Sequence, residues 1–149
     1  DHHSNIYTGS RSHTALMREL DVAFTNLLKD LDSTPSKHTP GKTLLDETLV
    51  ICMGEFGRTP GPISETRKGR EHHIHVHSGI FAGGGVKRGF ILGASDALGE
   101  FPKERPIGIQ DVYATMYHQL GIDFTKSYLN EANRPVQIVN YGETIQEIL

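Results

Sequence analysis

The stretch TLVICMGEFGRTP, residues 48–60, joins an apolar run to a short turn that carries two charged side chains. The run over residues 48–53 is typical of a buried strand. Glu55 and Arg58 follow it, and glycines separate them from the strand and from each other. Open α/β sheets present their sites at the carboxyl ends of such strands. The stretch therefore predicts a covered strand of a parallel sheet with a polar site at its end.

Helical periodicity lies on both sides of this stretch. Apolar residues recur at helical spacing from Ser12 to Leu31, and Ser12 or Ser10 is expected to cap that helix. A second helix is expected over residues 111–120, with Gly121 at its carboxyl end. Shorter elements are expected elsewhere: strands at 76–82, 90–92 and 136–139, a glycine turn at 83–85, and a last helical turn at 144–149.

Length and composition indicate one domain, residues 1–149, of ordinary soluble character. Hydrophobic residues make up 36% and charged residues 22% of the chain. The net charge of −3, without a basic stripe, argues against a nucleic-acid partner. The longest apolar run is too short to span a bilayer. Cys52 is the single cysteine and is expected to pack as a small hydrophobe.

A histidine-rich segment, REHHIHVH at residues 70–77, follows the first stretch. In an extended backbone His73, His75 and His77 share one face. Neutral imidazole is the commonest metal ligand in proteins, and Glu71 adds a carboxylate that suits Zn²⁺ or a similar ion. The alternative is a set of surface histidines on an edge strand, one or two of them hydrogen-bonded inside.

Glu55 and Arg58 have two interpretations each. A carboxylate at the end of a strand can coordinate a cation or accept a proton, and the alternative is a solvated loop glutamate. A guanidinium has the fork geometry to hold a phosphate, a sulfate or a carboxylate. Its alternative is a salt bridge from Arg58 to Glu55 that orders the loop.

The order of motifs resembles an uncharacterised bacterial family, domain of unknown function 1501. Members of that family carry a Trp-Asp-Thr-His-like motif, then GEFGRTP, then GRDHW, then an AGGG turn. The matching segments here are DHH at 1–3, GEFGRTP at 54–60, GREHH at 69–73, AGGG at 82–85, and residues 93–96 and 111–122. The resemblance covers almost the whole chain, and the GEFGRTP match is specific.

The chain is also similar to the alkaline-phosphatase-like superfamily, which includes the sulfatases. This resemblance implies an α/β fold with a three-layer, doubly wound, mostly parallel sheet, of which residues 1–149 form the carboxyl-terminal portion. A divalent metal would bind at the edge of the sheet, with zinc expected and manganese or calcium as alternatives. By position, the metal ligands are Asp1, His3, Glu55 and His72, and Arg70, Glu71 and His73 are additional candidates.

Two positions depart from the superfamily pattern. Phe56 replaces a histidine ligand, and Glu71-His72-His73 replaces Asp-His-Trp. The superfamily nucleophile lies near the amino end of the full domain and is absent from this chain, so we expect a nucleophile upstream of Asp1. Family members are exported through a twin-arginine signal, which implies a periplasmic or exported location.

Three functions follow from these patterns. The first is a metal-dependent hydrolase of a small phosphate or sulfate ester, with Glu55 and Arg58 as its catalytic residues. The second is a non-catalytic binding or interaction module that keeps the fold. The third is a metal-storage or metal-sensing patch formed by His73, His75 and His77.

Overall fold

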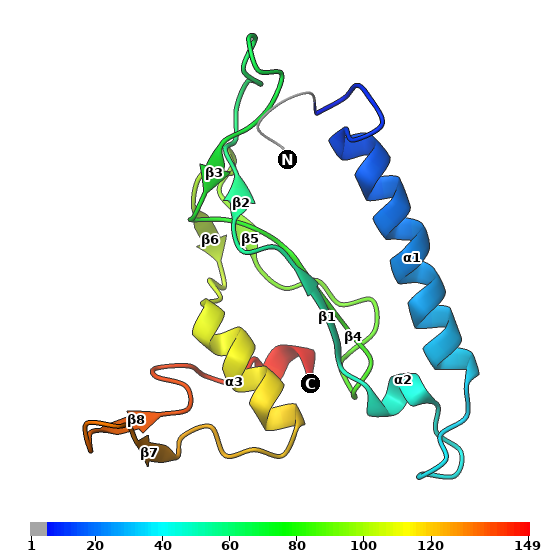
Figure 1. Cartoon of the computed structure of the whole chain (residues 1–149), viewed down its shortest axis with the longest axis vertical. Coiled ribbons are helices and arrows are strands. Elements are labelled where there is room, and N and C mark those ends of the chain that lie inside the picture. Colours follow the sequence, from blue (N-terminus) through cyan, green and yellow to red (C-terminus); the bar gives the residue numbers. More distant parts are fainter. Residues whose placement is uncertain (1–5) are drawn as a thin grey trace.

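The computed structural model describes residues 6–149, and its longest element is helix α1 (His13–Ser33) along one side of the molecule (Figure 1). The Ser12 hydroxyl accepts a hydrogen bond from the amide of Ala15 at 3.2 Å, which confirms Ser12 as the helix cap. No residue of α1 is buried: Leu20 is 44% exposed and Leu27 47% exposed. The apolar stripe of this helix is therefore not covered by residues 6–149.

Helix α2 (Leu44–Glu47) turns the chain into the predicted strand. Thr43 and Asp46 cap the start of α2 reciprocally, and hydrogen bonds from Thr43 hold the pKa of the Asp46 carboxyl below its ordinary value. Strand β1 (Val50–Met53) follows, so the strand expected at 48–53 is confirmed in a shorter form. The Leu45 side chain is buried beneath this connection.

The described strands pair in four separate two-stranded antiparallel sheets (Figure 1). β1 pairs with β4 (Gly79–Ala82), from Val50 opposite Ala82 to Met53 opposite Gly79. The other pairs are β2 (Gly57–Arg58) with β3 (His72–His73), β5 (Ala94–Ser95) with β6 (Pro102–Glu104), and β7 (Ser127–Leu129) with β8 (Pro135–Gln137). No parallel pair occurs within residues 6–149, and the three-layer, mostly parallel sheet stays a prediction.

Some of the shorter predicted elements are present in the structure and one is not. Helix α3 (Ile109–Gln119) and the 3₁₀ turn η1 (Gln146–Ile148) confirm the helix and the last turn expected there. Strand β8 overlaps the strand expected at 136–139 only at residues 136 and 137. The strand expected at 90–92 is wrong, because those residues form a loop between Gly89 and Gly93, both with left-handed backbone angles. The next strand, β5, begins only at Ala94.

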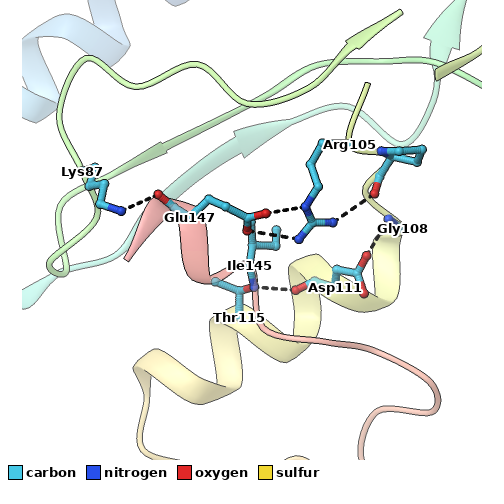
Figure 2. Close-up of polar contacts among 8 residues, drawn as sticks. Lys87, Arg105, Gly108, Asp111, Thr115, Ile145 and Glu147 are labelled. Carbon is cyan, nitrogen blue, oxygen red and sulfur yellow. Dashed lines mark hydrogen bonds and ion pairs between the residues drawn. The ribbon is translucent and has the colours of Figure 1, made fainter. Parts of the chain in front are cut away.

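The best-packed part of the described chain joins α3 to the carboxyl-terminal segment (Figure 2). Ala114, Thr115 and Ile145 are almost fully buried there. The Ile145 amide donates to the Thr115 hydroxyl at 2.9 Å, and that hydroxyl donates to the Asp111 carbonyl at 2.7 Å. Every buried polar group in this contact therefore has a partner, as a stable interior requires.

The segment is also held by charged groups (Figure 2). The Arg105 guanidinium pairs with both carboxylate oxygens of Glu147, and the Lys87 ammonium donates to the Glu147 carbonyl at 2.8 Å. The hydrogen bonds from Arg105 lower the pKa of Glu147 from 4.5 to about 2. This ion pair connects β6 and the loop after it to η1.

The elements form an open arrangement. The accessible surface is 10784 Å², whereas a compact monomer of 16.5 kDa exposes about 7,500 Å². The difference is consistent with the exposed stripe of α1 and with the half-exposed apolar strand β1. Within residues 6–149, none of the helices has the length and apolar character needed to cross a bilayer.

Candidate functional site

The segment that follows β1 and the histidine-rich segment meet in one hairpin, which we call the site hairpin (residues 55–75). Its strands β2 and β3 pair antiparallel, with Gly57 opposite His73 and Arg58 opposite His72. The Thr59 amide donates to the Glu71 carbonyl at 3.0 Å and extends the pairing by one residue. Glu55 lies two residues before Gly57, the register partner of His73.

Gly57 allows the two segments to approach this closely. A Cβ atom at this position would lie 1.8 Å from the Val76 carbonyl oxygen and 3.2 Å from the Cβ of His77. No larger residue fits without a shift of the backbone. Gly57, the second glycine of the GEFGRTP motif, is therefore required by packing at the base of the site hairpin.

The aromatic ring of Phe56 lies against the imidazole of His72. The ring centroids are 3.8 Å apart and the planes are tilted by 33°. The Arg58 guanidinium carbon lies 5.4 Å from the centroid of the same Phe56 ring, within the range of a cation–π contact. Phe56 therefore contacts both a guanidinium and an imidazole, while Glu55, the residue before it, is exposed.

Arginines order the loop of the site hairpin. Arg70 donates from one guanidinium nitrogen to the carbonyls of Thr59 and Gly61. Arg58 donates to the Arg70 carbonyl at 3.4 Å. Arg67 forms an ion pair with Glu71, and both side chains are largely exposed. Arg70 thus donates to the backbone of the loop, whereas Arg58 contacts both the loop backbone and the Phe56 ring.

His73 and His75 contact a second loop. The Nε2 atom of His73 lies 2.8 Å from the Glu100 carbonyl oxygen. Because a carbonyl only accepts, Nε2 carries a proton and Nδ1 is the atom that a neutral His73 offers to a cation. The His73 and His75 rings meet edge to face at 5.3 Å, and His75 lies 4.9 Å from the Phe101 ring.

Asp96 fixes the loop that carries these contacts. Its carboxylate accepts backbone hydrogen bonds from Leu98, Glu100 and Phe101 at 2.8–3.2 Å. The amide of Glu100 contributes most to lowering the pKa of Asp96. The Glu100 carbonyl and the Phe101 ring are therefore held in place against His73 and His75.

The structure brings together most of the residues that the sequence singled out. The site hairpin contains Glu55, Arg58, Arg70, Glu71, His72 and His73. His75 lies at a bend after β3, so His73, His75 and His77 do not lie on one extended strand, although the rings of His73 and His75 still meet. Asp1 and His3 lie outside the described residues.

The described residues alone do not form a complete metal centre. Over residues 6–149, no group of three or more His, Cys, Asp or Glu side chains is arranged to hold a metal ion. Glu55 and His72 supply a carboxylate and an imidazole, which are ligand types that zinc accepts. The two remaining ligands of the predicted set, Asp1 and His3, lie outside the described residues.

Sequence reasoning missed two features of this site. Phe56 was interpreted only as the loss of a ligand, whereas its ring contacts both His72 and Arg58. Glu100 and Phe101 were not singled out at all, although they contact His73 and His75. The Asp96-Ala97-Leu98-Gly99 turn signal was visible in the sequence, but it does not indicate which histidines its loop would meet.

Comparison with known proteins gives one result. A protein family described as "Protein of unknown function (DUF1501)" matches residues 1–149. No curated protein and no solved structure matches the chain.

Proposed function

The chain belongs to the DUF1501 family, whose function is unknown, and we propose that it provides the metal-binding edge of an alkaline-phosphatase-like hydrolase. The substrate would be a phosphate or sulfate ester, and the ion zinc or a similar divalent metal. The observation that carries the proposal is the 3.8 Å contact between the rings of Phe56 and His72. It puts the residue next to Glu55 directly on the imidazole of the proposed ligand His72.

The donor set fits a divalent ion in its chemistry. Glu55 is exposed at the turn after β1, and His72 is exposed on β3, so both side chains are accessible to an incoming ion. A carboxylate with an imidazole suits zinc, and the proposal takes Asp1 and His3 as the remaining ligands. When bound, the ion would polarise the ester oxygen and lower the pKa of a bound nucleophile.

Arg58 would bind the anionic oxygens of the ester. Arg58 is half-buried at the strand position opposite His72, and its guanidinium lies over the Phe56 ring. A planar guanidinium can hold two oxygens of a phosphate or sulfate and stabilise charge that develops on them. Arg70 would act through the loop, because its hydrogen bonds to the Thr59 and Gly61 carbonyls position the turn that begins at Glu55.

A second candidate is a non-catalytic binding module, favoured by Phe56 at a position where the superfamily has a histidine ligand. If the chain were such a module, we would expect Glu55 and Arg58 to form a salt bridge that orders the loop. Within residues 6–149, Arg58 contacts the Phe56 ring and the Arg70 carbonyl. The third candidate, a storage patch of three histidines on one strand face, is weakened by the bend at His75.

Calorimetry with Zn²⁺ and Mn²⁺, followed by inorganic phosphate and sulfate, tests the proposal. We expect one ion per chain, and binding of phosphate or sulfate only after the ion is present. Glu55→Gln and His72→Gln should each weaken ion binding about tenfold or more. Arg58→Lys should keep ion binding and weaken the anion. Unchanged ion affinity in both Glu55→Gln and His72→Gln would overturn the proposal.

A further inference from the structure

A groove lies between α3 and residues 138–141, apart from the residues of the site hairpin. Its volume is about 400 Å³, and Tyr113, Tyr117 and Tyr141 contribute to its lining together with Gln110 and Asn140. The chain has five tyrosines and no tryptophan, so three of its five tyrosines lie at this one groove. Tyr113 and Tyr117 are four residues apart and share one face of α3.

The walls of the groove are held firmly to each other. A Cβ atom at Gly142 would lie 2.4 Å from the Gln110 carbonyl oxygen, so the segment touches the first turn of α3 directly. The Asp111 carboxylate accepts from the Glu143 amide at 2.9 Å. It also accepts from the Gly108 amide at 2.9 Å, and the Thr115 hydroxyl accepts from Ile145 (Figure 2). Tyr141 therefore precedes a clamped segment, and its position relative to α3 is fixed.

Tyr141 has an unfavourable backbone conformation at the start of this clamped segment. Its φ is +60°, in the left-handed region that bulky residues rarely adopt, and its side chain is 99% exposed. An exposed ring gives no core packing in return for this strain. Strained residues of this kind concentrate at ligand sites, which indicates that the ring is presented for contact with a ligand.

The lining determines the chemistry of that ligand. None of the residues that line the groove carries a charge, so an ionic ligand would lose its hydration without a counter-charge. The amides of Gln110 and Asn140 each offer donors and an acceptor, and the phenol rings offer flat apolar faces. A neutral sugar matches both properties, because its hydroxyls pair with amides and its C–H face packs on an aromatic ring.

We infer that this groove binds one or two rings of a neutral saccharide, with Tyr141 and Tyr113 as the stacking platforms and Gln110 and Asn140 as the hydrogen-bonding groups. A volume of about 400 Å³ is within the range of small-molecule sites. The inference does not depend on the cation site: neither a sugar nor any of these residues is used there.

The test uses cellotriose, maltotriose and N-acetylchitotriose as probes, and each is titrated while tyrosine fluorescence and the ring resonances of the protein are recorded. We expect at least one trisaccharide to bind, and Tyr141→Ala and Tyr113→Ala to weaken it about tenfold or more. Tyr128→Ala, at a 63% exposed tyrosine on β7 away from the groove, is the matched control and should leave affinity unchanged.

A second variant separates ligand binding from folding. Glycine adopts the left-handed conformation without strain, so Tyr141→Gly should fold like the wild type and still lose the sugar. Absence of binding by all three trisaccharides overturns the inference, as does wild-type affinity in Tyr141→Gly. Binding of a proline-rich decapeptide in their place would show that the groove takes a peptide and would equally overturn it.

Discussion

The imidazole of His72 lies against the ring of Phe56, with the centroids 3.8 Å apart and the planes tilted by 33°. Glu55 directly precedes Phe56, and Arg58 is the register partner of His72. One aromatic contact thus joins the end of the GEFGRTP segment to the histidine-rich segment. The contact restricts rotation of the imidazole and so fixes where its nitrogens lie.

Replacement of Phe56 tests this positioning. We predict that Phe56→Ala lowers the affinity for Zn²⁺ about tenfold, because a ligand imidazole that loses its supporting contact must be ordered by the ion itself. Calorimetric titration measures the change. Phe101→Ala is the matched control, because Phe101 contacts His75 and not His72. An equal loss in both variants would mean that the Phe56 contact has no special role.

Two glycines of the same segment should respond differently to alanine. At Gly57 a Cβ would lie 1.8 Å from the Val76 carbonyl oxygen, whereas at Gly54 the nearest atom is the Phe56 carbonyl oxygen at 3.4 Å. We predict that Gly57→Ala lowers the free energy of unfolding by about 1–3 kcal/mol and that Gly54→Ala changes it little. Urea denaturation followed by circular dichroism compares them. A Gly57→Ala variant as stable as Gly54→Ala would contradict the close approach.

Alanine should lower the free energy of unfolding much more at a buried position than at an exposed one. Ile145 is 2% exposed, and Ile145→Ala is expected to cost about 2–5 kcal/mol of unfolding free energy. Leu20→Ala, on the uncovered stripe of α1, should stay within about 0.5 kcal/mol. The same denaturation experiment measures both. A large loss at Leu20 would show that the stripe of α1 is covered in solution.

The Arg105–Glu147 pair gives a pH dependence. The pKa of Glu147 is lowered from 4.5 to about 2 in the folded chain, so the unfolded chain binds the proton more tightly. The pair therefore stabilises the fold fully above pH 4.5, and this contribution is lost as the pH falls toward 2. We predict that Glu147→Gln removes part of the acid sensitivity of the unfolding midpoint between these pH values.

The comparison for this experiment is between wild type and Glu147→Gln at each pH, because other carboxyls, such as Asp46 and Asp96, also have lowered pKa values. The difference between the two proteins should be largest near neutral pH and should shrink as the solution becomes acidic. A difference that is constant with pH would contradict the pairing of Glu147 with Arg105.

Local signals in the sequence predicted local structure well. The Ser12 cap, the apolar strand after Thr48 and the helix that ends before Gly121 depend on spacing and cap chemistry within a few residues. Pairing was harder to predict, because the partner of a strand depends on distant residues. The bend at His75 and the contact between Glu100 and His73 are features of this kind, and Glu100 follows His73 by 27 positions.

The most direct test is an anomalous-difference map from a crystal soaked in zinc. We predict one peak about 2.0–2.2 Å from a Glu55 carboxylate oxygen and from a His72 imidazole nitrogen. The same peak should be absent from crystals of Glu55→Gln. A zinc ion bound only at His73 and His75, or no ordered ion at all, would contradict the central claim that Glu55 and His72 hold one cation together.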